Sequence, residues 1–235
     1  MTKKERKNRW QPAIDYRKLR LHNLTGNEFK HLLLLLYWPV YGLLFMFVER
    51  FYAVAHYTAM YCRLDDLIPF CEWFVIPYLF WFVYMIGMIL YTLLYDVDAF
   101  RYMMRFIIIT YSITIAIYLI WPTCQNLRPA AFERDNLLTR FMAQFYQFDT
   151  NTNVCPSIHV LGTMAVLLTS CHCRSTSTPG WKIAFTVAAV LICASTVFLK
   201  QHSILDVAAA FALCPVPSIA TALARGKRRQ CAGNS

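Results

Sequence analysis

The stretch FVIPYLFWFVYMIGMILYTLLY, residues 74–95, contains no charged side chain. A helix needs roughly 17–25 mostly apolar residues to cross the hydrocarbon core of a bilayer, so this stretch predicts a transmembrane helix. The rest of the chain has the same character. It is 58% hydrophobic and 15% charged, whereas a soluble domain carries about 25% charged residues. The composition therefore predicts a membrane protein.

Five other runs without Asp, Glu, Lys or Arg are near spanning length, and the six together predict an all-α, six-transmembrane-helix bundle. The predicted spans are approximately Leu32–Val48, Phe74–Tyr95, Phe106–Pro122, Val154–Cys171, Ile183–Leu199 and Val207–Ala224. Pro215 and Pro217 are expected to kink the last span. The predicted organisation is a basic tail (residues 1–30), one membrane domain (31–224) and a second basic tail (225–235).

The basic residues predict the orientation of these spans. Seventeen of the 23 Lys and Arg residues lie in the two tails and in the loops on the same side, and six lie in the other loops. Cytoplasmic loops carry the excess of Lys and Arg, so both termini are expected in the cytoplasm of a multi-pass protein of the cell membrane. The net charge of +10 is then a topology signal. Nucleic-acid binding is not expected, because no soluble basic surface is available.

The longest predicted outer loop is residues 123–153, and its aromatic side chains favour an ordered helix at the membrane interface. In another outer loop, Asp65-Asp66 is expected to be solvated or to cap a helix. Cys62 and Cys71 would be able to pair if that loop faces an oxidising compartment. Cys171-His172-Cys173 lacks the second ligand pair of a structural zinc site, so no metal site is expected.

The candidate reactive residues lie near span ends that the charge count puts on the outer face. His159 begins the fourth span, and His202 and Asp206 begin the sixth. Arg128 lies in the long outer loop, and Lys200 lies next to His202. A His-x-x-x-Asp spacing alone arises easily by chance. Ionisable groups near lipid are costly, however, and the whole set at one depth favours a functional site.

These residue types suit phosphoryl transfer. His202 and Asp206 share a helix face because they are four residues apart. The carboxylate would hold the proton of one imidazole nitrogen, which leaves the other nitrogen as a nucleophile. The fourth and sixth spans both begin at the outer face, so both would present unpaired N–H groups to a phosphate.

At these residues the chain resembles the type 2 phosphatidic acid phosphatase superfamily, the lipid phosphatases related to vanadium haloperoxidases. That family has the signatures Lys-x6-Arg-Pro, Pro-Ser-Gly-His and Ser-Arg-x5-His-x3-Asp. Here they appear as Arg128-Pro129, as Pro156-Ser157-Ile158-His159, and as Ser195-Thr196 followed by His202 and Asp206. The family lysine falls on Trp121, the third-motif arginine on Thr196 and the glycine on Ile158. With these departures, the chain is similar to the branch of the superfamily that contains inositol phosphorylceramide synthases.

The resemblance implies a role for each matching residue. His202 would be the nucleophile that forms a phosphohistidine, Asp206 would orient it, and His159 would protonate the leaving alkoxide and later activate the acceptor. Phosphate oxygens would be held by Arg128, Ser157, Ser195 and, more weakly, Lys200. The mechanism implied by the family needs no metal or other cofactor.

The expected function is therefore hydrolysis of lipid phosphomonoesters or diphosphates at the outer membrane face. The first alternative is a lipid phosphotransferase of the same fold, similar to inositol phosphorylceramide or sphingomyelin synthases. The second is a transporter or an inactive scaffold, which clustering of the ionisable residues at one end disfavours. The expected partners are the bilayer and a lipid phosphate substrate; no obligate protein partner and no nucleic acid are expected.

Overall fold

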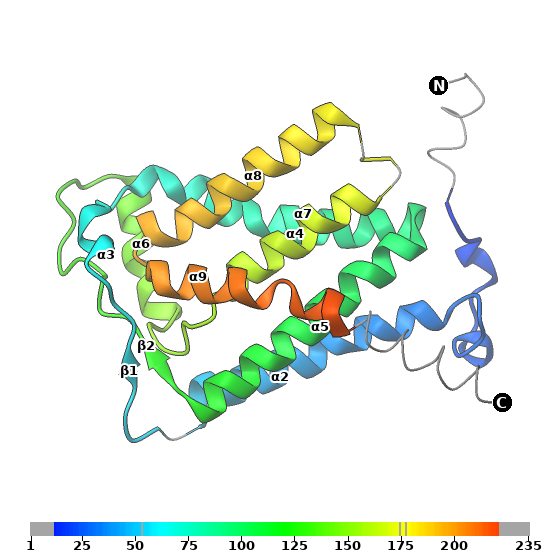
Figure 1. Ribbon diagram of the computed structural model, residues 1–235, viewed down its shortest axis with the longest axis horizontal. Coiled ribbons are helices and arrows are strands. Elements are labelled where there is room, and N and C mark those ends of the chain that lie inside the picture. Colours follow the sequence, from blue (N-terminus) through cyan, green and yellow to red (C-terminus); the bar gives the residue numbers. More distant parts are fainter. Residues whose placement is uncertain (1–11, 53, 174, 177, 221–235) are drawn as a thin grey trace.

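The computed structural model describes residues 12–220 except 53, 174 and 177, and it is a mostly helical bundle (Figure 1). Four helical segments in this part of the chain are long and apolar enough to cross a membrane. They are Lys30–Arg50, Glu72–Tyr95, Val97–Ile120 and Pro179–Phe198. Two shorter apolar segments, Ile158–His172 and Ile204–Ala220, complete the bundle.

The segments correspond to the following elements. η3 (Lys30–Leu36) continues into α2 (Tyr37–Arg50), and η4 (Glu72–Phe74) continues into α4 (Val75–Tyr95). The others are α5 (Val97–Ile120), α7 (Ile158–His172), α8 (Pro179–Phe198) and α9 (Ile204–Leu213). Short 3-10 turns, η1 (Tyr16–Lys18) and η2 (Leu21–Asn23), precede them. Two-residue strands β1 (Thr58–Ala59) and β2 (Thr123–Cys124) pair in parallel, a small departure from the predicted all-α fold.

The helix ends follow local capping signals. Asp96 ends α4 and caps α5 by accepting a hydrogen bond from the Ala99 N–H. Helix α5 begins at Val97, well before the predicted Phe106, because the helix includes Arg101 and Arg105 and therefore extends beyond the uncharged run. In the last segment a turn separates α9 from the residues that follow Pro215, as the two prolines predicted. Residues 221–224 of the predicted span lie outside the described residues.

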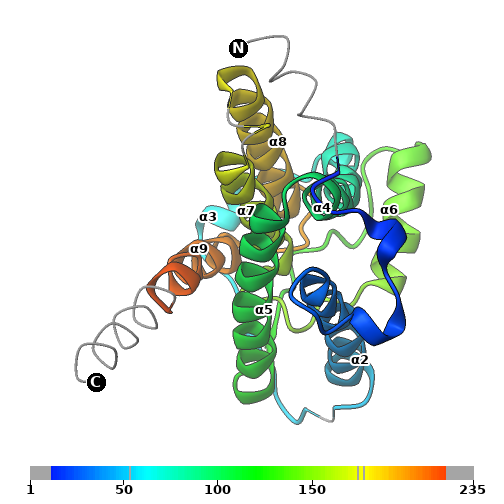
Figure 2. The ribbon, with the colours of Figure 1, turned by 90° about the vertical axis from the view of Figure 1, so that its right-hand side faces the viewer.

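Helix α7 lies in the middle of the bundle, between α5 and α8, with α4 on one side and α9 on the other (Figure 2). Its Val160, Leu161, Ala165 and Val166 are fully buried. Gly162 permits this close packing. A Cβ atom at that position would lie 2.6 Å from the Tyr111 hydroxyl of α5 and 3.0 Å from the Trp81 ring of α4. A residue without a side chain is therefore required one turn after His159.

The long predicted outer loop is ordered, and most of its second half is helix α6 (Leu137–Phe148). Asn136 begins this helix by accepting hydrogen bonds from the N–H groups of Leu138 and Thr139. One side of α6 packs on the start of α4 through Met142, which is fully buried in a cluster with Tyr78. Helix α6 and the short helix α3 (Leu64–Leu67) lie at the same end of the bundle (Figure 1).

Candidate active site

The two predicted histidines meet at the end of the bundle that carries α3 and α6. Helices α4, α7 and α9 begin at this end, and α5 and α8 finish there (Figure 1). His159 is in the first turn of α7, and His202 is in the turn between α8 and α9. Their ring centroids are 6.1 Å apart, with the ring planes inclined at 61°.

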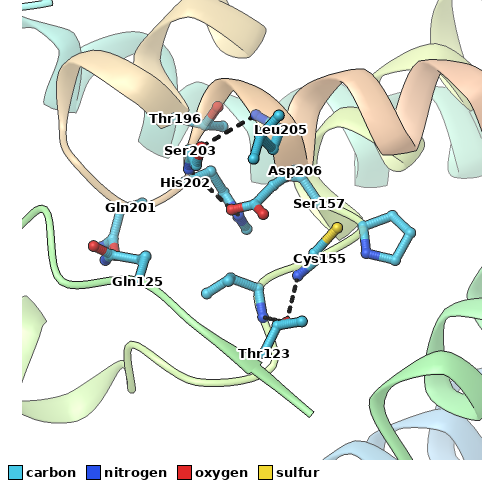
Figure 3. Close-up of polar contacts among 12 residues, drawn as sticks. Thr123, Gln125, Cys155, Ser157, Thr196, Gln201, His202, Ser203, Leu205 and Asp206 are labelled. Atoms are coloured by element: carbon cyan, nitrogen blue, oxygen red, sulfur yellow. Dashed lines mark hydrogen bonds and ion pairs between the residues drawn. The ribbon is translucent and has the colours of Figure 1, made fainter. Parts of the chain in front are cut away.

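His202 is held by the carboxylate predicted for it. Its Nδ1 atom lies 3.2 Å from Oδ2 of Asp206, which also accepts a hydrogen bond from the Ser203 N–H (Figure 3). Asp206 is fully buried. In the neutral tautomer whose Nδ1–H donates to this carboxylate, Nε2 carries the free lone pair. The pair has the arrangement that an activated histidine needs.

His159 has different surroundings. Its ring stacks on Tyr78 at 4.6 Å and contacts Trp81 at 4.5 Å, centroid to centroid. Neither of its ring nitrogens makes a hydrogen bond to a described residue. The two histidines therefore differ in environment: His202 has a buried carboxylate partner, and His159 is held between aromatic rings.

The main chain around His159 is fastened by aromatic side chains. Tyr118 donates to the Pro156 carbonyl at 2.8 Å, and Tyr111 donates to the Ile158 carbonyl at 3.1 Å. Trp81 donates its indole N–H to the His159 carbonyl at 3.0 Å. These donors come from α5 and α4, so two neighbouring helices fix the position of His159.

The two helix starts differ in the N–H groups that they offer to an anion. At α7, Ser157 caps the Val160 N–H, and the N–H groups of Ile158 and His159 have no acceptor among the described residues. At α9, the Ile204 N–H is bonded to Asp65 and the Leu205 N–H to Ser203. The prediction that both helix starts offer unpaired N–H groups is therefore wrong for α9. Helix α7 alone offers a pair beside the histidines.

Arg128 is close to this site but is engaged by the protein. Its terminal nitrogens donate to the carbonyls of Tyr146, Asp149 and Thr150 and to the side chain of Gln201, at 2.6–3.0 Å. The guanidinium also lies 4.5 Å from the Tyr146 ring centroid. Burial lowers the pKa of Arg128, and the nearby Asp149 carboxylate opposes that shift. In this arrangement Arg128 ties the loop after α6 to the His202 turn, and only its Nε–H is left without a partner among the described residues.

The other predicted phosphate-binding residues are in three different situations. Ser157 is fully buried as the cap of α7, next to the unpaired N–H groups. Ser195 is fully buried inside α8, where its hydroxyl donates to the Ile192 carbonyl. Lys200 points to the other side of the turn, where its ammonium donates to the carbonyls of Asp65 and Ile68. The structure thus brings Ser157 to the histidines, but it directs the polar groups of Ser195 and Lys200 elsewhere.

The two positions at which the resembled motifs carry a cation, Trp121 and Thr196, have side chains that bond within the protein. The Trp121 indole donates to the Thr58 hydroxyl, and the Thr196 hydroxyl donates to the Cys193 carbonyl.

Several polar residues near the site were not predicted. Asp149 is partly buried, and burial raises its pKa, whereas the charges of Arg128 and His202 oppose the shift. Gln201 directly precedes His202, and Glu49 bonds to the loop before α7.

The described residues include no group of three His, Cys, Asp or Glu side chains arranged to hold a metal ion. Cys62 and Cys71 are free thiols, and His172 stacks on Tyr102, away from the histidine pair.

A scan against protein-family models and searches of curated proteins and of solved structures find no match to this chain.

Proposed function

We propose that this chain is a multi-pass lipid phosphatase of the cell membrane. It would hydrolyse lipid phosphomonoesters or diphosphates at the outer face through a phosphohistidine intermediate. The proposed topology has six spans with both termini in the cytoplasm. Helix α7 is the fourth span, and the segment that begins with α9 is the sixth. Four long apolar helices and the excess of basic residues on one side support this topology.

The observation that carries the proposal is the pair of unlike histidines, 6.1 Å apart at one end of the bundle. One has a buried carboxylate on Nδ1, and the other is held between two aromatic rings with its nitrogens unpaired among the described residues. The two come from segments far apart in the sequence, and a shared structural role does not explain why they face each other. Their positions are explained if one histidine is a nucleophile and the other is a general acid, on opposite sides of a phosphorus atom.

In the first half-reaction, Nε2 of His202 attacks phosphorus and the bond from phosphorus to the lipid oxygen breaks. His159 gives its proton to the departing alkoxide, and Asp206 stabilises the positive charge on the phosphorylated imidazole. The N–H groups of Ile158 and His159 are positioned to donate to the phosphoryl oxygens as negative charge builds up. In the second half-reaction, His159 takes a proton from water, the water oxygen attacks phosphorus, and the P–N bond breaks to release phosphate.

Phosphotransfer to an alcohol is the second candidate, and it is favoured because few cations near the two histidines are free among the described residues. The terminal N–H groups of Arg128 are bonded to the protein, and the Lys200 ammonium lies on the far side of the turn. A phosphodiester carries one negative charge, whereas a phosphomonoester carries nearly two at neutral pH. A site with few free cations fits the phosphodiester of a phospholipid head group better. An acceptor alcohol would then replace water in the second half-reaction.

The test is to incubate the purified full-length protein with a panel of lipid phosphates and phospholipids, with and without alcohol acceptors such as ceramide and diacylglycerol. Release of inorganic phosphate without an acceptor supports the phosphatase. A new phospholipid that appears only with an acceptor supports the transferase. If neither product forms, and no acid-labile phosphohistidine is trapped from any substrate, the proposal is wrong.

A further inference from the structure

The short helix α3 lies against the turn that carries His202. Asp65 of α3 is 2% exposed, and its carboxylate accepts three hydrogen bonds. The donors are the Ser203 hydroxyl at 2.7 Å, the Ile204 N–H at 2.8 Å and the Cys62 N–H at 2.8 Å. A buried carboxylate is costly unless it is hydrogen-bonded. This one is satisfied largely by the two residues that directly follow His202.

The same loop also holds the residues before His202. Lys200 has a φ of 52°, which is uncommon for a residue other than glycine. Its ammonium group reaches back to the carbonyls of Asp65 and Ile68, and the Cys71 N–H donates to the Phe198 carbonyl at 3.1 Å. The turn from α8 to α9 is therefore fixed on both sides of His202 by residues 62–71.

Ser203 links this loop to the catalytic pair. Its N–H donates to Asp206, and its hydroxyl donates to Asp65 (Figure 3 shows Ser203 beside His202 and Asp206). The Ser203 backbone directly continues that of His202, so its position sets how the imidazole meets the Asp206 carboxylate. We propose that Asp65 is a positioning residue for His202 and that, through Ser203, it fixes the imidazole in line for attack on phosphorus. This inference rests on the proposed function.

A simpler role for Asp65 would be to cap α9 and stabilise the fold without affecting the reaction. The two roles give different kinetics. A residue that only stabilises changes how many molecules are folded, whereas a positioning residue changes the rate constant of every folded molecule. A displacement of about 1 Å in a reacting group can cost about 100-fold in rate.

The chain offers a matched control at the next position. Asp66 is also a carboxylate of α3, but it is exposed and its side chain accepts a hydrogen bond from Tyr61. Among the described residues it makes no hydrogen bond to the His202 turn, and it acts on Lys200 through its charge. Asp65→Asn keeps the shape of the side chain but replaces one acceptor oxygen with an amide donor, so at least one of its three bonds is lost. Asp66→Asn makes the same chemical change outside the turn.

The experiment measures phosphohistidine formation in a rapid-quench apparatus, using labelled 4-nitrophenyl phosphate and full-length protein in detergent. We expect Asp65→Asn to lower the rate constant by about 100-fold, with the same amplitude per folded protein. Asp66→Asn should leave the rate constant and the amplitude unchanged. Ser203→Ala removes only the hydroxyl that is bonded to Asp65 and Leu205, and it should also lower the rate constant. This variant tests the same link if Asp65→Asn does not fold.

A reduced amplitude with an unchanged rate constant would mean that Asp65 only stabilises the fold, and it would overturn the inference. Equal rate constants for Asp65→Asn and Asp66→Asn would also overturn it. Failure of the proposed function is seen separately, in the unmodified protein. If that protein forms no phosphohistidine from any substrate, the function and this inference are both wrong.

Discussion

The N–H group of Ser157 donates to the main-chain carbonyl of Asp206 at 3.2 Å. This bond joins the residue before α7 to the first turn of α9, so the helix of His159 is fastened to the helix that carries the carboxylate of His202. A main-chain contact therefore helps to set the distance between the two histidines.

His202→Ala is expected to abolish turnover while the protein still inserts and folds. Losing a covalent nucleophile should cost several orders of magnitude in rate, because only direct attack by water remains. The measurement is steady-state phosphate release from the best lipid substrate, with thermal unfolding as the check on folding. His172→Ala is the control, since that histidine stacks on Tyr102 outside the site. Normal activity of His202→Ala would exclude the phosphohistidine mechanism.

The topology makes a separate prediction. A cysteine introduced at position 140 should react with a membrane-impermeant reagent added to intact cells, because residues 123–153 are expected outside. Arg140 is 70% exposed and pairs only with Asp135 among the described residues, so Arg140→Cys should not disturb folding. The native cysteines can also react with the reagent. The unmodified chain, labelled under the same conditions, therefore serves as the background. Labelling at position 140 only after lysis would contradict the orientation and with it an outer active site.

The sequence predicted the helices and the contact between His202 and Asp206 because both depend on short-range patterns. An uncharged run such as Phe74–Tyr95 must be helical to satisfy its backbone in lipid, and α4 covers Val75–Tyr95. The structure also pairs His202 with Asp206. They do not share a helix face as expected, because α9 begins at Ile204 and His202 lies in the turn before it.

The unpredicted contacts of Arg128 and Asp65 depend on segments that are distant in the sequence. The Arg128 donors are used by Tyr146, Asp149 and Thr150, whose approach follows from the path of the loop after α6. Asp65 was expected to be solvated or to cap a helix. It is buried, and it bonds to the start of a helix far along the chain. A buried carboxylate and an exposed one look identical in a sequence until the partner segment is known.

Gly162→Ala is expected to lower both stability and activity. The added methyl group would lie 2.6 Å from the Tyr111 hydroxyl, which holds the main chain beside His159. Overpacking of this kind costs about 1–3 kcal/mol, and it should lower the unfolding temperature in detergent. Gly87→Ala is the matched control, because nothing lies within 4 Å of its Cβ position. Equal unfolding temperatures for the two variants would show that α7 can shift without cost.

Arg128→Lys separates a structural clamp from a phosphate ligand. A single ammonium cannot reproduce the four bonds of the guanidinium, and breaking a buried network of this kind should cost about 3–5 kcal/mol. We expect a marked fall in the unfolding temperature whether or not phosphate is present. Arg140→Lys, at an exposed ion pair, should change it little. If Arg128→Lys is as stable as the unmodified protein but binds lipid phosphate weakly, the clamp interpretation is wrong.

His159→Ala should distinguish between substrates by their leaving groups. A lipid alkoxide needs a proton as it departs, and general acid catalysis is worth roughly 10²–10⁴-fold for such a group. Nitrophenolate leaves without one. The variant should therefore lose most of its activity on lipid phosphates but still form phosphohistidine from 4-nitrophenyl phosphate. It should then stall, because His159 also activates the acceptor in the second half-reaction. Equal losses on both substrates, without a trapped intermediate, would mean that His159 only helps to bind phosphate.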